Sequence, residues 1–153
     1  MKLFPWQKDP EFFTEEEKKQ LIDAIKKAEQ RTSGEVRIFV ESRCRFVNAA
    51  DRAKEIFAKL EMYKTEQRNA TLIYVAVKDR QAAVYGDEGI HQKVGAEYWK
   101  DLVTRMLGMF KDEKLADGIC LGITALGEAL NAYFPYNNDT DKNELPDEIV
   151  FGR

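Results

Sequence analysis

A continuous apolar run, ATLIYVAV at residues 70–77, constrains the fold of this chain most strongly. Apolar side chains at every position, rather than at every second one, are typical of a strand that is covered on both faces. The polar residues KDRQ follow, and then a second apolar segment, AAVYG at 82–86. The two segments predict a β-hairpin with Asp79 in its turn. Such a hairpin requires other secondary-structure elements packed on both of its faces.

Upstream of the hairpin, the sequence predicts a helix, a strand and a second helix. The first helix begins at a capping box of Thr14 and Glu17, and we expect it to end at Gly34. Residues 35–42 alternate as a strand, with apolar side chains inward and charged ones mostly outward. Residues 48–62 have a helical apolar stripe, with an asparagine as the N-cap.

Downstream of the hairpin, we expect one helix from residue 90 to about 111 and another over 114–133. The second contains three glycines, which cost helix stability and suggest close packing against a neighbour. A right-handed crossover makes the first two strands parallel, and the hairpin adds an antiparallel third. The chain is therefore an α/β protein, a three-layer α/β/α sandwich whose small mixed sheet has helices on both faces. Residues 1–153 form one domain, with a core at about 11–136 and a polar C-terminal extension at 137–153.

Net charge and hydropathy bear on the partners and the compartment expected for this chain. The net charge of −3 and the pI near 5.4 argue weakly against nucleic acid, because a phosphate backbone attracts a basic face. No apolar run approaches the roughly 18 residues that span a bilayer. The N-terminus lacks the apolar region of a secretory signal, so we expect a cytoplasmic protein. In that compartment Cys44 and Cys120 are expected to be free, largely buried thiols.

The predicted topology gathers polar residues at one end of the sheet, where the first strand begins. Glu35 opens that strand, and Arg68 and Asn69 precede the parallel second strand. The antiparallel third strand returns to the same end, which is therefore expected to hold Ser33, Glu35, Asn69, Asp87, Glu88 and His91. A second, weaker collection of acids lies at the opposite end: Glu41, Asp79, Asp112, Glu113 and Asp117.

Carboxylate and amide oxygens at the first end suit a hard cation such as Ca²⁺ or Mg²⁺. We predict Glu35, Asp87 and Glu88 as metal ligands; the secondary candidates are Asn69, His91, Asp79 and Asp117. One histidine and no nearby thiol pair argue against a tight zinc site. The N–H groups at the start of the following helix also suit a phosphate. A simpler alternative stays open, in which Asp87 and Glu88 only cap that helix.

Several segments together resemble the TPM domain family: AEQRTSGEVRIFVES, the hairpin region through VYGDEGI, DGICLGITALGEALNAYFP and NELPDEI. The family includes thylakoid-lumen proteins linked to photosystem II repair and bacterial membrane-anchored proteins, and this chain resembles a short, soluble bacterial-type member. The resemblance covers roughly residues 11–150. It implies a Rossmann-like α/β/α sandwich, divalent-cation binding (calcium in particular) and a weak acid-phosphatase activity. The positions it carries over are Ser33–Glu35 and Gly86–Gly89.

Three functions follow from these observations. The first is a calcium-binding domain with a regulatory or repair-related role. The alternative is a weak metal-assisted acid phosphatase acting on phosphate esters, in which Asp87 is the candidate nucleophile or base. The third is a protein-interaction module, in which the C-terminal extension covers the sheet edge or docks a protein partner.

Overall fold

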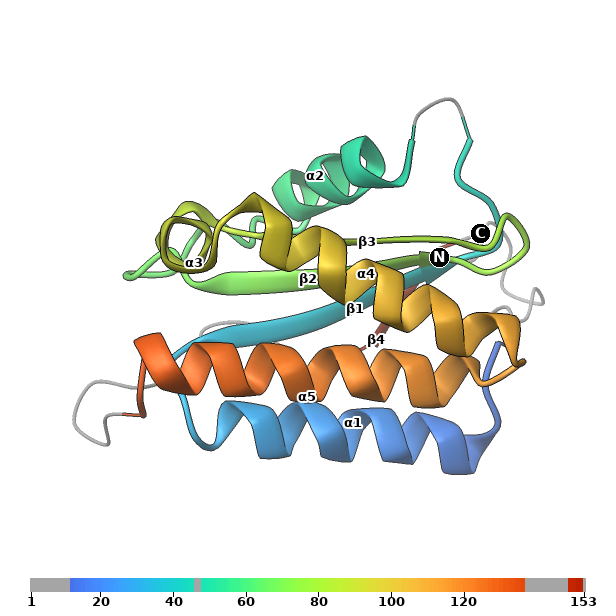
Figure 1. The fold of residues 1–153 in the computed structure, drawn as a ribbon, viewed down its shortest axis with the longest axis horizontal. Helices are drawn as coiled ribbons and strands as arrows, with labels where there is room; N and C mark the ends of the chain where they lie inside the picture. Colours follow the sequence, from blue (N-terminus) through green and yellow to red (C-terminus); the bar gives the residue numbers. More distant parts are fainter. Residues whose placement is uncertain (1–11, 46–47, 137–148, 153) are drawn as a thin grey trace, which may run out of the picture.

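The computed structural model describes residues 12–45, 48–136 and 149–152 (Figure 1). Within these ranges the strands form one sheet in the order β3-β2-β1-β4. The strands are β1 (Glu35–Glu41), β2 (Ala70–Ala76), β3 (Gln81–Gly86) and β4 (Ile149–Phe151). β1 is parallel to β2 and to β4, whereas β3 returns antiparallel to β2. The mixed sheet that the sequence predicts is therefore confirmed.

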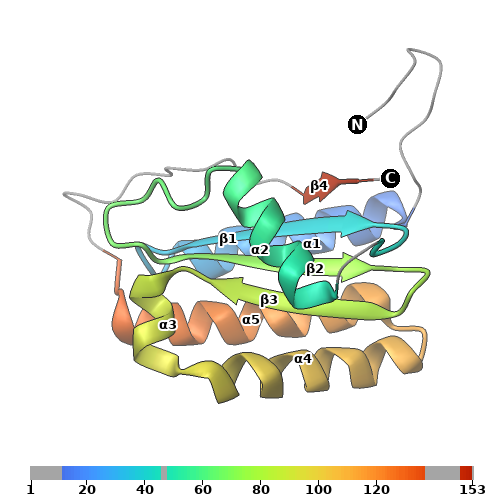
Figure 2. The ribbon, with the colours of Figure 1, turned by 90° about the horizontal axis from the view of Figure 1, so that it is seen from above.

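Helices cover both faces of this sheet (Figures 1 and 2). One face carries α1 (Glu15–Glu29), α4 (Ala96–Lys111) and α5 (Leu115–Tyr133); the other carries α2 (Ala49–Lys59). The short α3 (Glu88–Val94) follows β3 at the end of the sheet. Two apolar clusters hold these layers together, one on each face. The three-layer α/β/α architecture is thus confirmed.

Both predicted N-caps are present. Thr14 and Glu17 form the capping box of α1, in which each side chain accepts a hydrogen bond from the backbone N–H of the other residue. The Asn48 side chain accepts from the N–H of Asp51 and starts α2. Both caps are local in sequence, which explains why they could be predicted without tertiary information.

Two predicted helix boundaries are wrong. The helix α1 ends at the C-cap Gln30, and Gly34 instead precedes β1, where an added Cβ would lie 2.7 Å from the Leu130 side chain. The helix expected over 90–111 is divided into α3 and α4 at Gly95, whose φ is +82°. A right-handed helix does not continue through a residue in that left-handed region. The apolar periodicity continues across Gly95, so it did not reveal the break.

The charged residues of β1 do not face solvent as the alternating pattern predicts. Glu35, Arg37 and Glu41 are all buried, because β1 is an inner strand and α2 covers its second face. Burial of ionised groups is costly unless they are paired. The partners of these side chains therefore matter for any site at the ends of the strands.

The expected polar extension contributes a strand. Its residues 149–151 form β4 and pair with β1 at Ile38–Val40, so this part of the segment covers the sheet edge. Residues 137–148, with the NELPDEI motif except for its last isoleucine, lie outside the described residues.

Close packing of α5 gives a test of the fold. An added Cβ at Gly127 would lie 2.8 Å from the Cβ of Ala28 in α1, so Gly127→Ala must push these helices apart. We expect a loss of about 1–3 kcal/mol in the free energy of unfolding, measured by chemical denaturation.

The matched control is Gly108→Ala in α4, where an added Cβ meets no atom within 4 Å. Alanine at an open helical position is expected to stabilise the protein by about 0.5–1 kcal/mol. Equal effects of the two substitutions would contradict the close approach of α1 and α5.

Candidate functional site

The acidic residue Asp87 is held by an arginine of the same chain. Asp87 directly follows β3 and is only 3% exposed. Arg68 binds its carboxylate with two nitrogens, Nε to Oδ2 at 2.7 Å and Nη2 to Oδ1 at 2.9 Å. Such paired, charge-assisted hydrogen bonds are stronger than neutral ones. The same carboxylate accepts from the N–H of Glu88 at 2.8 Å and so caps α3.

Backbone contacts between the loop before β2 and the start of α3 position Arg68 beside Asp87. The carbonyl of Arg68 accepts from the N–H of Gly89 at 2.8 Å, and an added Cβ at Gly89 would lie 2.1 Å from the carbonyl oxygen of Gln67. Only glycine permits this approach of the loop to the start of α3. Arg68 itself has a φ of +52°, an uncommon conformation for a residue with a Cβ. Gly89 is thus required by packing against the loop that carries Arg68.

Glu88 contributes a second, weaker contact to the same guanidinium. Its Oε1 lies 3.3 Å from Arg68 Nη1, and the Glu88 side chain is mostly exposed. Exposed ion pairs of this kind stabilise a fold little. Two carboxylates therefore converge on one guanidinium, chiefly through the hydrogen bonds that Arg68 donates to Asp87. These hydrogen bonds also raise the pKa of Arg68. The rim formed by Arg68, Asp87 and Glu88 keeps one excess negative charge.

The other residues predicted for this end do not all join that rim. Glu35 pairs with Ala70, whose carbonyl accepts from the N–H of Asp87. Glu35 and Asp87 thus lie on opposite sides of β2, on the face toward α2, with about 10 Å between their backbones. Among the described residues, no three His, Cys, Asp or Glu side chains gather closely enough to hold a metal ion.

Asn69 and His91 are engaged elsewhere. The Asn69 amide donates to Ser33 Oγ at 3.2 Å, and its Oδ1, in a residue 1% exposed, has no hydrogen-bond partner among the described residues. Its one side-chain hydrogen bond in the described residues is therefore with the loop before β1 and not with Asp87 or Glu88. The exposed His91 accepts a hydrogen bond at Nδ1 from Trp99 Nε1 at 2.9 Å. That nitrogen is therefore occupied.

The N–H groups proposed as a phosphate cradle are partly used by the chain. The first, of Glu88, donates to the Asp87 side chain, and the second, of Gly89, donates to the Arg68 carbonyl. The helix α3 is also only seven residues long. Two donors that an anion would need are therefore satisfied internally.

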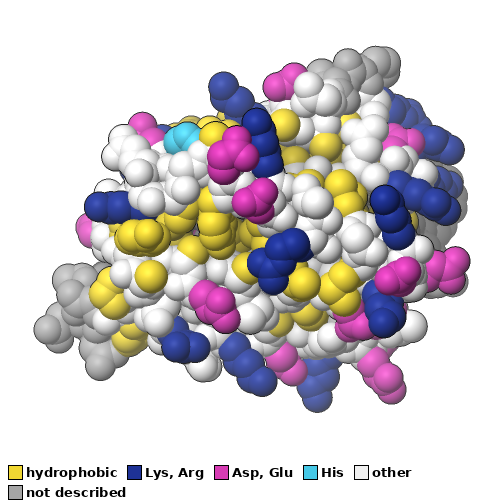
Figure 3. Space-filling model, in the orientation of Figure 1, with side chains coloured by type: hydrophobic (Ala, Val, Ile, Leu, Met, Phe, Trp, Pro, Cys, Tyr) yellow, Lys and Arg dark blue, Asp and Glu magenta, His cyan; other side chains and the backbone are white. Residues whose placement is uncertain are grey.

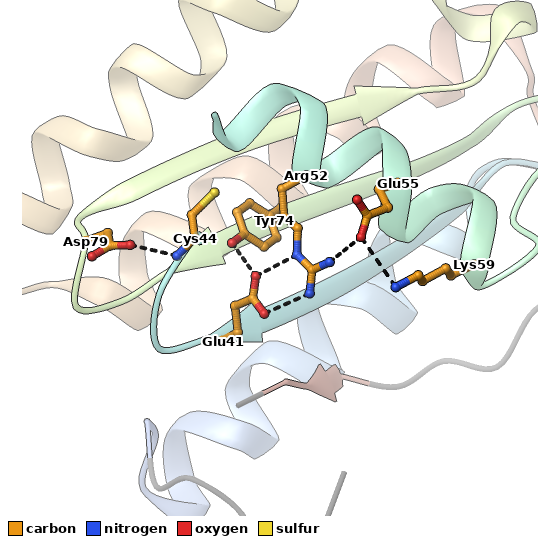
Figure 4. A network of polar contacts seen from close by, with 7 residues as sticks. All are labelled: Glu41, Cys44, Arg52, Glu55, Lys59, Tyr74 and Asp79. Atoms are coloured by element: carbon orange, nitrogen blue, oxygen red, sulfur yellow. Dashed lines mark hydrogen bonds and ion pairs between the residues drawn. The ribbon is translucent and has the colours of Figure 1, made fainter. Parts of the chain in front are cut away.

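At the opposite end of the sheet, Glu41 is held by Arg52 and Tyr74 (Figure 4). Arg52 of α2 donates to both carboxylate oxygens at 2.9 and 3.0 Å, and the Tyr74 hydroxyl donates to one of them. Burial and this hydrogen bond raise the pKa of Tyr74 far above its ordinary value, so the phenol stays neutral and remains a donor. Arg52 also pairs with Glu55, which contacts Lys59.

Two further acids of that end, Asp79 and Asp117, have separate partners. Asp79 accepts from the backbone N–H of Cys44 at 2.7 Å and from Arg43 at 2.9 Å, so it joins the hairpin turn to the loop after β1. Asp117 lies in the first turn of α5 and accepts from Gln20 of α1. The second collection is thus divided between the two faces of the sheet. Sequence reasoning missed the arginines as site members, although the topology that places Asn69 at one end also places Arg68 there.

The helical face carries a shallow groove of about 830 Å³ between α1 and α5. Apolar side chains gather in a band across this face, and charged side chains of both signs surround it (Figure 3). The groove is lined by both signs of charge, including Lys19, Lys27, Asp23 and Glu128, together with Cys120 and Thr124. This mixture defines no particular ligand.

Comparison with known sequences decides the family. The TPM domain profile matches residues 7–129, most of the chain. The chain belongs to the TPM domain family. Comparison with curated proteins gave no match. None of the helices within the described residues is long and apolar enough to cross a membrane.

Two solved structures are similar to this TPM domain. The NMR structure of BA42 from the psychrophilic bacterium Bizionia argentinensis is 40% identical, with a TM-score of 0.85, and the match covers 95% of this chain and 99% of BA42. The N-terminal domain of cg2496 from Corynebacterium glutamicum is 13% identical, with a TM-score of 0.56 and coverage of 81% and 85%. The second likeness shows the fold alone.

The Glu41 network gives a stability prediction for this TPM domain. Glu41→Ala leaves the Arg52 guanidinium and the buried Tyr74 hydroxyl without their shared acceptor. We expect a loss of about 2–4 kcal/mol in the free energy of unfolding, because removing one partner of a buried pair leaves the other buried polar group without its acceptor.

Glu55→Ala is the matched control, because it removes an exposed carboxylate from the same arginine. Its effect in the same urea titration should be much smaller. A Glu41→Ala protein as stable as the control would show that the network contributes nothing to the fold.

Proposed function

We propose that this TPM domain binds a divalent cation at the rim formed by Arg68, Asp87 and Glu88, and that it acts as a regulatory binding module rather than a catalyst. Calcium is the expected ion and Mg²⁺ the alternative. The observation that supports this proposal is the position of Arg68, whose guanidinium lies between two carboxylates. This place in the fold already stabilises a positive charge.

The side chains present fit a weak site. Asp87 and Glu88 supply carboxylate oxygens, which are the ligands that Ca²⁺ and Mg²⁺ prefer. Calcium takes six to eight oxygens, so water must supply most of the shell. Glu35 lies two strands from Asp87, and the Asn69 amide bonds to Ser33. A site with so few protein ligands is expected to bind Ca²⁺ at about 0.1–1 mM, as the weak extracellular modules do.

A cation must compete with Arg68 for the same oxygens. The Arg68 side chain is 41% exposed, so its guanidinium has room to leave the carboxylates for solvent. Asp87 cannot leave in the same way, because it is buried and caps α3. The arginine is therefore the movable member of the pair and the carboxylate the fixed one.

The contacts favour binding over phosphate-ester hydrolysis. Both oxygens of Asp87 accept hydrogen bonds, which makes this carboxylate a poor nucleophile or base. The nearby imidazole of His91 is hydrogen-bonded to Trp99. A nucleophile needs a base within hydrogen-bond reach, and these contacts provide no such pair.

Calorimetric titration with Ca²⁺ tests the proposal on three proteins. The unaltered chain should bind weakly, and Arg68→Gln should bind several-fold more tightly, because the competing internal cation is gone. Asp87→Asn should abolish the heat. The same order is expected for the rise in melting temperature at saturating Ca²⁺, since a ligand bound to the folded state alone stabilises it.

The control is Glu97→Gln, which removes an exposed carboxylate in the first turn of α4. Its Ca²⁺ affinity should equal that of the unaltered chain. If neither the unaltered chain nor Arg68→Gln gives a saturable heat, the rim is a structural cap and ion pair, and the proposal fails. Aryl-phosphate turnover that is lost in Asp87→Asn would favour the phosphatase alternative instead.

A further inference from the structure

The C-terminal strand β4 is a short addition to the edge of the sheet (Figure 2). It pairs with β1 in parallel over three residues, Ile38–Val40, whereas β1 and β2 pair over seven. The N–H of Gly152 extends the pairing by donating to the Val40 carbonyl at 2.7 Å. All four residues from 149 to 152 are half-buried, while Ile38 and Val40 beneath them are fully buried. The segment therefore covers the core but is not part of it.

An aromatic side chain anchors this segment. The Phe151 ring lies 6.2 Å from the ring of Phe12 and 6.2 Å from that of Phe13, at the N-terminal end of α1. Lys18 Nζ is 5.8 Å from the centre of the same ring, within the range of a cation–π contact. These side chains form a receptor for one aromatic residue beside the β1 edge.

The next position accepts only glycine. An added Cβ at Gly152 would lie 2.8 Å from Cζ of Phe39 and 2.9 Å from Cβ of Glu41. Both contacts are shorter than side chains tolerate. The edge therefore selects an extended segment by main-chain hydrogen bonds, an aromatic anchor and a glycine directly after it.

We propose that this edge of β1 is a docking site for an extended peptide of a partner protein, and that the chain's own residues 149–152 occupy it as an internal competitor. The partner peptide adds a parallel strand to β1, a known mode of recognition in which main-chain hydrogen bonds give affinity and side-chain pockets give specificity. Its chemistry is that of the resident segment: two aliphatic residues, an aromatic residue and a glycine.

The small extent of β4 makes exchange feasible. Three paired residues, the hydrogen bond from the Gly152 N–H and the Phe151 ring hold the segment, and a peptide with the same features recovers these contacts. Because the resident segment is covalently attached, it competes at an effective concentration on the order of millimolar. An external peptide therefore binds the unaltered chain more weakly than a chain whose own segment is impaired.

Fluorescence anisotropy with a labelled peptide, Asp-Glu-Ile-Val-Phe-Gly-Arg, tests this proposal on full-length proteins. We expect Phe151→Ala to bind the peptide at least tenfold more tightly than the unaltered chain. Peptides with alanine in place of the phenylalanine, or valine in place of the glycine, should lose at least tenfold in affinity. Tyr133→Ala, which removes an exposed aromatic side chain of α5, should behave as the unaltered chain.

Three results of these binding experiments would overturn the proposal. One is a Phe151→Ala protein with an unchanged circular dichroism spectrum that does not bind the peptide. Another is peptide binding that is insensitive to the valine substitution. Concentration-dependent dimers of the unaltered chain without peptide binding would also overturn it, because the edge would then exchange strands between copies.

Hydrogen exchange on the unaltered chain tests the same idea without a substitution. The Gly152 amide should exchange at least a hundredfold faster than the amides of β2, because β4 can leave β1 without unfolding the sheet. Equal protection of the two strands would show that β4 is a fixed part of the sheet and would contradict the proposal.

Discussion

The structure depends on a sheet that is covered on both faces. Because α2 closes the second face of the sheet, the acids at the ends of β1 and β3 are buried rather than solvated. A buried carboxylate needs a partner, and the chain supplies arginines at opposite ends of the sheet. Arg68 binds Asp87, and Arg52 binds Glu41. These arginines, rather than the acids alone, define the polar centres of the domain.

Local signals in the sequence predicted much of this fold. The capping box at Thr14, the N-cap Asn48 and the apolar run of β2 each depend on a few neighbouring residues. The parallel pairing of β1 and β2 follows from the crossover rule. In contrast, the break at Gly95 depends on a backbone angle, and β4 depends on a contact with a strand more than a hundred residues earlier. The apolar periodicity of the sequence indicates neither the break at Gly95 nor the pairing of β4.

The candidate site, like the fold, could be predicted from the sequence only in part. Topology placed Glu35, Asn69 and Asp87 at one end of the sheet, but the Asn69 amide bonds to Ser33 rather than to the rim. The pairing of Asp87 with Arg68 depends on the close approach that Gly89 permits. No short motif encodes such an approach. The TPM domain therefore has a guanidinium between two carboxylates at one end of β3 and a short edge strand beside β1, on separate parts of the same sheet.

The central claim is that Arg68 occupies the place of a cation between Asp87 and Glu88. The most direct measurement follows the Arg68 Nε–H signal by NMR while Ca²⁺ is added. The account predicts that this signal shifts, and that its exchange with water quickens, as Ca²⁺ takes the carboxylates from the guanidinium. An Arg68 signal that stays unchanged at saturating Ca²⁺ would contradict the account.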